Sequence, residues 1–251
     1  MDELFIFSAA FFAGLINALA GGGTLVSFPA LLALGIPPVT ANITNTLALC
    51  PGYCGGMIAQ RKEFAYQKNR IRRILPVCII GGLFGGFLLI HSDESSFRAL
   101  IPYLILFATV LLAVQDRVKQ VMLTGSYHKS HPRLVTGGGF LLLFLAALYG
   151  GYFGAGVSVI IIAVLGLLYD DSLVSLNILK LIISFSVNLA ASVYFIFTGK
   201  IEWALVVIMS IGSVCGGLVG GTFVEMVHPE LFRWIIVGLG LCISVWYFVS
   251  G

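Results

Sequence analysis

The chain has 251 residues, of which 59% are hydrophobic and only 10% are charged. A soluble domain carries about 25% charged residues, so this composition excludes a protein whose whole surface faces water. The net charge is +3, and most of the basic residues lie in two short clusters, which indicate orientation in a membrane better than they indicate a nucleic-acid partner. Several apolar stretches approach or exceed the roughly 20 residues that cross a bilayer as a helix. The sequence therefore predicts an all-α polytopic membrane protein.

The first half contains four long apolar stretches and one short one. The long stretches cover residues 4–20, 39–60, 74–90 and 98–115. The short stretch, 24–36, would be about 20 Å long as a helix, too short to cross alone. It follows Gly21-Gly22-Gly23 and ends at Pro37-Pro38, where proline stops a helix. Residues 1–118 are therefore predicted to form one repeat with four transmembrane helices and one glycine-broken short element.

The second half follows the same order. Its long stretches cover residues 134–152, 173–198, 203–224 and 231–250, and a short one lies near 157–169 after Gly154-Ala155-Gly156. A glycine pattern also recurs, because Gly81-Gly82-x-x-Gly85-Gly86 corresponds to Gly212-Ser213-x-x-Gly216-Gly217 at an offset of 131. Residues 134–251 are predicted to be a second repeat, which makes about eight transmembrane helices in all.

Two loops, 61–73 and 116–133, hold most of the basic residues. The positive-inside rule predicts that both are cytoplasmic, with residues 119–133 as a basic linker between the repeats. Four crossings per half would make the repeats parallel and place both termini in the cytoplasm. If each short element were also a crossing, the repeats would be inverted. The sequence leaves both arrangements open.

Small-xxx-small patterns occur in residues 81–86 and 212–221. Glycines at this spacing let two helix backbones approach closely and pack by dispersion. The pattern predicts internal helix packing, with a homodimer interface as the alternative.

Lys180 is the only charged residue within the apolar stretch 173–198. It lies about 13 Å along a helix from Asp171, near mid-membrane if Asp171 lies at an interface. A charge at that depth is costly and usually faces a polar interior or a pathway. Its helix face also carries Asn177, Ser184 and Asn188. Lys180 and Asn177 are therefore candidates to bind an anion or carry a proton, and a lysine that snorkels to the interface is the structural alternative.

Asn42, Thr44 and Asn45 form a polar group after the double proline. At an offset of 133, Asn42 corresponds to Ser175 and Thr44 to Asn177. We expect the two groups to face one another across the seam, which is the interface between the two repeats, and to offer hydrogen bonds to an oxyanion. Helix capping by these side chains is the alternative.

The glycine runs are the third candidate element, with Gly21, Gly22 and Gly23 in one half and Gly154 and Gly156 in the other. Glycine lets the backbone unwind and expose its N–H groups. A helix that begins just after either run would point its positive dipole end at the gap, which suits an anion. A kink or close packing is the alternative.

No cofactor is expected. Five cysteines fall in apolar segments without a CxxC pair, which predicts neither a disulfide framework nor a metal site. The four histidines all lie in loops, and the sequence contains no HExxH, GxSxG or P-loop motif. We therefore expect a protein that is not an enzyme.

One long motif begins at Gly21-Gly22-Gly23, continues through Pro29-Ala30-Leu31-Leu32-Ala33-Leu34-Gly35 and ends at Ala41-Asn42-Ile43-Thr44-Asn45-Thr46. It resembles the sulfite exporter TauE/SafE family of bacterial membrane transporters. The second-half glycine doublets and Gly199-Lys200-Ile201-Glu202-Trp203 also resemble the family, so the similarity covers essentially the whole chain. It implies a multi-pass transporter of the inner or plasma membrane for a small anion such as sulfite or a sulfonate. Leu176-Asn177-Ile178-Leu179-Lys180 departs from the Thr-Ser pair of many members, which points to a different substrate.

These features together predict an exporter of a small anion that works by secondary alternating access. The driving force would be an ion or proton gradient, because the sequence has no ATP-binding motif. A passive anion channel is the first alternative, and an intramembrane enzyme or partner subunit is the second.

Overall fold

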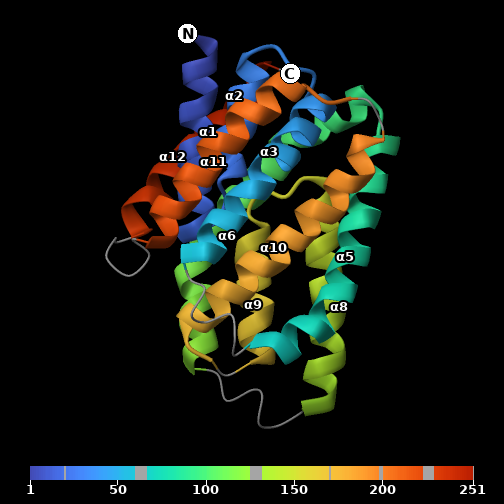
Figure 1. Ribbon diagram of the computed structural model, residues 1–251, viewed down its shortest axis with the longest axis vertical. Helices are drawn as coiled ribbons and strands as arrows, with labels where there is room; N and C mark the ends of the chain where they lie inside the picture. The colour runs from blue at the N-terminus through green and yellow to red at the C-terminus, as the bar shows by residue number, and fades with distance from the viewer. Residues whose placement is uncertain are drawn as a thin grey trace.

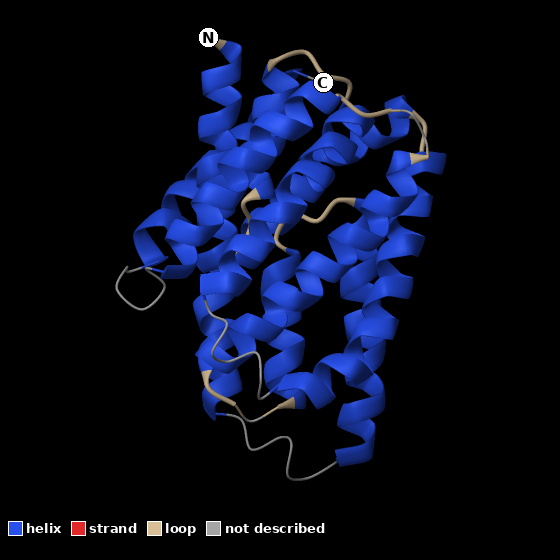
Figure 2. Ribbon diagram, in the orientation of Figure 1, coloured by secondary structure: helices blue, strands red, loops and turns tan. Residues whose placement is uncertain are grey.

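The computed structural model describes residues 1–19, 21–59, 67–124, 132–169, 171–197, 200–222 and 229–250. All regular elements in these residues are helices (Figure 2). Eight of the described helices have 18 residues or more, and two have 10 and 12. Five of the long helices are long and apolar enough to cross a membrane. The prediction of an all-α polytopic membrane protein is confirmed.

The helices occur in the same order in both halves. The first half contains α1 (Asp2–Leu19), the short α2 (Thr24–Ala33), α3 (Pro38–Ala59), α5 (Lys68–His91) and α6 (Glu94–Thr124). The second half contains α8 (Pro132–Tyr152), the short α9 (Val157–Leu168), α10 (Leu173–Ile196), α11 (Trp203–Thr222) and α12 (Pro229–Ser250). The predicted linker 119–133 lies partly outside the described residues, and α6 extends into it.

Local sequence signals explain where several helices begin. Pro38 opens α3, where a missing backbone N–H costs nothing. The Asp93 carboxylate caps α6 by accepting hydrogen bonds from Ser95 Oγ at 2.6 Å and Ser96 N at 3.0 Å. These bonds lower the pKa of Asp93 to about 2. Ser172 caps α10 in the same way, since its hydroxyl accepts a bond from the backbone N–H of Ser175.

The two halves run in opposite directions. Figure 1 shows α1 descending from the N-terminus at the top, whereas α8 rises from the foot of the molecule. The chain ends near the top again, so both termini lie at the same end. Each half contributes five described helices when the short one is counted, which is an odd number. The parallel arrangement is therefore wrong, and the inverted alternative describes these helices.

The fourth helix of each half packs on the other half. Helix α5 lies against α8 and α10, and α11 lies against α1 and α3. Helix α3 also contacts α10, and α6 contacts α12. The halves are thus interleaved, and the surface between them is the interior of the molecule.

Glycines make these exchanged contacts close. A Cβ at Gly85 would overlap the carbonyl oxygen of Leu148 on α8, and one at Gly220 would overlap that of Leu15 on α1. The prediction that the small-xxx-small patterns serve internal packing is confirmed for these glycines. Leu148 and Leu15 are 133 residues apart, whereas Gly85 and Gly220 are 135 apart.

The repeat register therefore changes along the chain. Helix α9 has 12 residues and α2 has 10, so the offset rises from 133 before the short helix to 135 after it. With this offset Gly81-Gly82-x-x-Gly85-Gly86 matches Gly216-Gly217-x-x-Gly220-Gly221 at all four glycines. The predicted offset of 131 is wrong by about one helical turn, because the second half repeats its glycines every turn.

Candidate functional site

The two glycine runs interrupt the fold in the same way. Gly21 and Gly154 have φ of 88° and 82°, a left-handed conformation that favours glycine. The backbone N–H of each donates to a carbonyl five residues earlier, Ile16 O at 2.8 Å and Tyr149 O at 3.2 Å. Helices α1 and α8 thus both end in a reversal of the chain with left-handed glycine. The predicted breaks are present at equivalent places. The break at residues 21–23 is called the first break, and the break at residues 154–156 the second break.

The two breaks lie next to each other. A Cβ added to Gly21 would overlap the side chain of Ser158, in the first turn of α9. Neither α2 nor α9 has a side-chain cap at its start, which is formed by Gly23 and Gly156 respectively. Ser158 is buried. Two helix N-termini, each the positive end of a dipole, therefore begin inside the protein near the seam.

Lys180 lies at the first break. Its side chain is only 1% exposed, and Nζ donates to the carbonyl oxygen of Asn17 at 3.3 Å. Asn17 belongs to the last turn of α1, where carbonyl groups carry the negative end of the helix dipole. A snorkelling lysine would reach the protein surface, so that interpretation does not describe Lys180. The structure instead holds its amino group in the interior.

Asparagines from the third helices reach the ends of the first helices across the seam. Asn177 Nδ2 on α10 donates to Ala18 O on α1 at 3.5 Å. Asn42 Nδ2 on α3 donates to Tyr152 O on α8 at 2.8 Å. The two asparagines are 135 residues apart and make the same kind of contact. Asn42 therefore corresponds to Asn177, and the predicted match to Ser175 is wrong because it neglects the two extra residues of α9.

The same register matches Asn45 to Lys180. Asn45 is 1% exposed, like Asn42, and the side-chain oxygens of both have no hydrogen-bond partner among the described residues. Thr44 differs, because its hydroxyl accepts a hydrogen bond from the backbone N–H of Glu202, just before α11. The structure thus brings Asn42 to the second break and gives Thr44 a role at the start of another helix.

Asn17 is a further polar residue at the site, and sequence reasoning missed it. Its Oδ1 accepts a hydrogen bond from the backbone N–H of Gly23 at 2.8 Å, and its carbonyl accepts the bond from Lys180. The side chain is 5% exposed. The polar side chain of Asn17 within the otherwise apolar last turns of α1 is the sequence feature that could have identified it. Asn17 links the end of α1 to the start of α2 across the first break.

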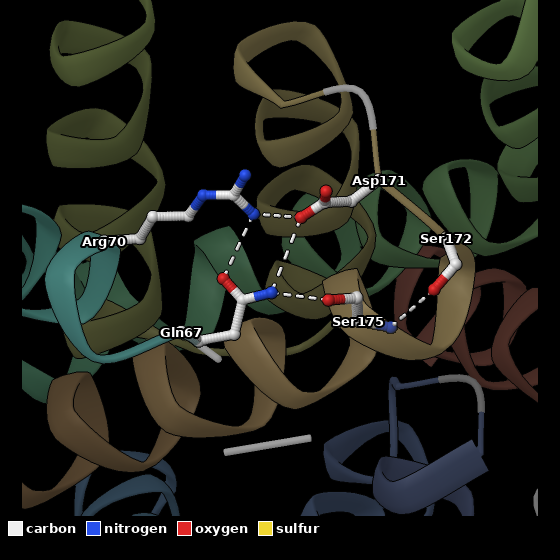
Figure 3. A network of polar contacts seen from close by, with 5 residues as sticks. All are labelled: Gln67, Arg70, Asp171, Ser172 and Ser175. Atoms are coloured by element: carbon white, nitrogen blue, oxygen red, sulfur yellow. Dashed lines mark hydrogen bonds and ion pairs between the residues drawn. The ribbon is translucent and has the colours of Figure 1, made fainter. Parts of the chain in front are cut away.

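A second polar cluster lies at the start of α10 (Figure 3). Arg70 on α5 forms an ion pair with Asp171, and Gln67 hydrogen bonds to Arg70, Asp171 and the hydroxyl of Ser175. The side chains of Arg70 and Asp171 are 35% and 22% exposed. The cluster joins the beginning of α5 to the connection between α9 and α10, and thus ties helices from the two halves together.

Comparison with known proteins gives a consistent result. The family profile described as "Sulfite exporter TauE/SafE" matches residues 6–247. A "Probable membrane transporter protein" of Haemophilus influenzae is 29% identical over 92% of this chain and 89% of its own. "Probable membrane transporter protein ORF9" of Sinorhizobium is 24% identical over 96% and 90%, and "Probable membrane transporter protein YfcA" of Escherichia coli K12 is 24% identical over 92% and 84%. No solved structure matches the chain.

Proposed function

Because the chain belongs to the sulfite exporter TauE/SafE family of multi-pass membrane transporters, we propose that it exports a small anion by secondary alternating access. The observation that carries this proposal is the buried amino group of Lys180 at a broken helix. An intramembrane lysine is costly, and it is retained most often where it faces a pathway or a substrate. A sulfur oxyanion such as sulfite or a sulfonate is the substrate class we favour.

The anion would bind at the junction of the two breaks. Lys180 would supply the charge, and Asn177 would supply an amide N–H beside it. The positive dipole ends of α2 and α9 would complete the site, after Gly21, Gly22 and Gly23 in one half and Gly154 and Gly156 in the other. Buried helix N-termini suit an oxyanion because each is the positive end of a helix dipole.

Inverted repeats support alternating access over a passive channel. In transporters with this symmetry the substrate lies at the repeat interface, and one repeat moves against the other. The two halves also differ in a way that fits such motion. Ala108 and Leu112 on α6 are fully buried, whereas their counterparts Ile243 and Tyr247 on α12 line a groove of about 460 Å³ beside α2. If α6 and α12 exchanged these two arrangements, the groove at α12 would close and an equivalent groove at α6 would open.

A flux assay tests the proposal. Purified protein in liposomes would be given radiolabelled sulfite, sulfate and a small sulfonate, with and without an ion or pH gradient. We expect saturable flux of one anion, accelerated by a gradient, and at least a tenfold loss in Lys180→Ala. Lys200→Ala is the matched control, since Lys200 lies outside the site and should retain the flux.

Other results would reject parts of the proposal. Flux that never saturates and ignores gradients would favour the passive anion channel. Unchanged flux in Lys180→Ala would remove the lysine from the site. Chemical conversion of the anion without net movement would favour an intramembrane enzyme.

A further inference from the structure

The second break carries a feature that the anion site does not use. We propose that Asn42, Asn45 and the carbonyl end of α8 bind a monovalent cation such as Na⁺. The direct evidence is the pair of amide oxygens, Asn42 Oδ1 and Asn45 Oδ1, which are buried without a hydrogen-bond partner among the described residues. A buried amide oxygen without a hydrogen-bond partner loses its hydration uncompensated, so a ligand for two of them would relieve that penalty.

The position of these oxygens favours a positive ligand. Asn42 and Asn45 are three residues apart on α3 and therefore share a face of that helix. The hydrogen bond from Asn42 Nδ2 to Tyr152 O fixes this face at the last residue of α8. The end of a helix is the negative end of its dipole, and it attracts cations. Carbonyls at the ends of broken helices hold Na⁺ in other transporter folds with inverted repeats.

The other half shows which charge belongs there. Lys180 occupies the position equivalent to Asn45, and its ammonium group binds a carbonyl in the last turn of α1. The second repeat thus places the amino group of Lys180 at the end of α1, which is the first helix of the other repeat. Among the described residues, the equivalent place in the other repeat has the neutral oxygens of Asn42 and Asn45 and no ammonium group. A bound monovalent cation would restore the same charge there.

The chemistry of the ligands selects a monovalent ion. Amide and backbone oxygens are hard neutral donors, whereas Ca²⁺ sites in proteins use several carboxylates and zinc sites use Cys and His. Within the described residues, no three His, Cys, Asp or Glu side chains gather as a metal site would require. The proton alone would not serve, because an asparagine amide does not take up a proton at physiological pH.

A cation here would couple ion binding to anion binding, and this part rests on the proposed function. Both proposed sites lie at the interface between the repeats, where the two breaks touch through Gly21 and Ser158. Opposite charges attract more strongly in a poorly hydrated interior than in water. Na⁺ would therefore raise the affinity for the anion, and an Na⁺ gradient would become a source of energy for transport.

The experiment measures ²²Na⁺ binding to the purified protein without sulfite, sulfate or sulfonate, in buffers of choline chloride. We expect saturable binding to the wild type that falls at least tenfold in Asn45→Leu. Asn45→Lys is expected to abolish the binding, because a tethered ammonium would replace the ion. Asn188→Ala is the matched control, since this buried asparagine donates to Ser184 O within its own helix and lies outside the site. Thermal unfolding in detergent identifies any variant that fails to fold.

The outcomes separate this inference from the anion site. Lys180→Asn should lose anion flux but keep ²²Na⁺ binding, because it leaves the oxygens on α3 intact. No saturable ²²Na⁺ binding to the wild type would overturn the cation site while leaving the anion transporter in place. Equal binding by Asn45→Leu and wild type would also overturn it.

Discussion

Cys50 on α3 contacts Phe185 on α10, with its sulfur 3.9 Å from the phenylalanine carbonyl oxygen, and the two residues are 135 positions apart. A residue that touches its own repeat counterpart lies on the axis that relates the repeats. Asn45 and Lys180 each precede this contact by five residues, about 7.5 Å along their helices. Because α3 and α10 run in opposite directions, these two side chains lie on opposite sides of the axis. The proposed cation and anion sites are therefore related by the internal symmetry.

Close packing at the exchanged helices should make Gly216 intolerant of a larger side chain. A Cβ there would overlap the Phe11 carbonyl oxygen, which is backbone and cannot move aside. We expect Gly216→Ala to cost about 1–3 kcal/mol or more, seen as a lower Tm in detergent. Gly238→Ala on α12 is the control, because nothing lies within 4 Å of its Cβ. It should be neutral or stabilising by up to about 1 kcal/mol. Equal melting of the two variants would contradict the packing argument.

The first break should need glycine for two reasons that a pair of variants can separate. Gly21 and Gly35 both have left-handed φ, of 88° and 79°. An added Cβ at Gly21 would also overlap Ser158, whereas Gly35 has open space around it. We expect Gly35→Ala to cost only the backbone strain of about 1–2 kcal/mol and to keep anion flux. Gly21→Ala should lose most of its flux in folded protein. Similar flux in both variants would show that contact between the breaks is unimportant.

The inverted repeats predict where the termini lie. Helix α5 begins and α6 ends in the lower part of Figure 1, away from both termini, and basic residues cluster at these two ends. The positive-inside rule makes that lower end cytoplasmic. The termini should then face the other side of the membrane. Alkaline phosphatase fused after residue 250 should be active and green fluorescent protein dark. Fusions within 125–131 should give the opposite pattern, and a fluorescent C-terminal fusion would refute the orientation.

The ion pair between Arg70 and Asp171 should contribute modestly to stability. Both side chains are partly exposed, so solvent screens the pair and about 0.2–1 kcal/mol is expected. A double-mutant cycle with Arg70→Met and Asp171→Asn, read by Tm, measures the coupling. We expect it to shrink at high salt, because mobile ions screen exposed charges. A coupling near zero at low salt would mean that Gln67 and Ser175 hold this junction without the charges.

Much of this architecture could be predicted from residues alone. Apolar stretches bounded by glycine and proline predict the eight long and two short helices of the part that the structure describes, and an isolated charge predicts that Lys180 is an interior residue. The relative direction of the two repeats could not be predicted, because a short apolar stretch does not reveal whether it counts as a membrane crossing. The match between repeats was also displaced, because Gly212 and Ser213 imitate a doublet one turn away from the true one.

The partners of the polar side chains lay beyond prediction as well. Asn42, Thr44 and Asn45 lie within four consecutive residues, yet Asn42 binds the end of α8 and Thr44 binds the backbone before α11. Which neighbour each residue meets depends on how α3 crosses helices more than 100 residues away. Tertiary packing sets those crossings, and local sequence does not encode them.

The exchange of fourth helices also governs how the chain must be made. Helix α5 is synthesised before α8 and α10, the helices that cover its glycines, so its small-residue faces enter the bilayer without partners. Helix α1 waits even longer, until α11 emerges from the ribosome. Lipid, or an insertion chaperone, must shield these faces during most of translation. Assembly is therefore a late event, completed only when the last helices have been inserted.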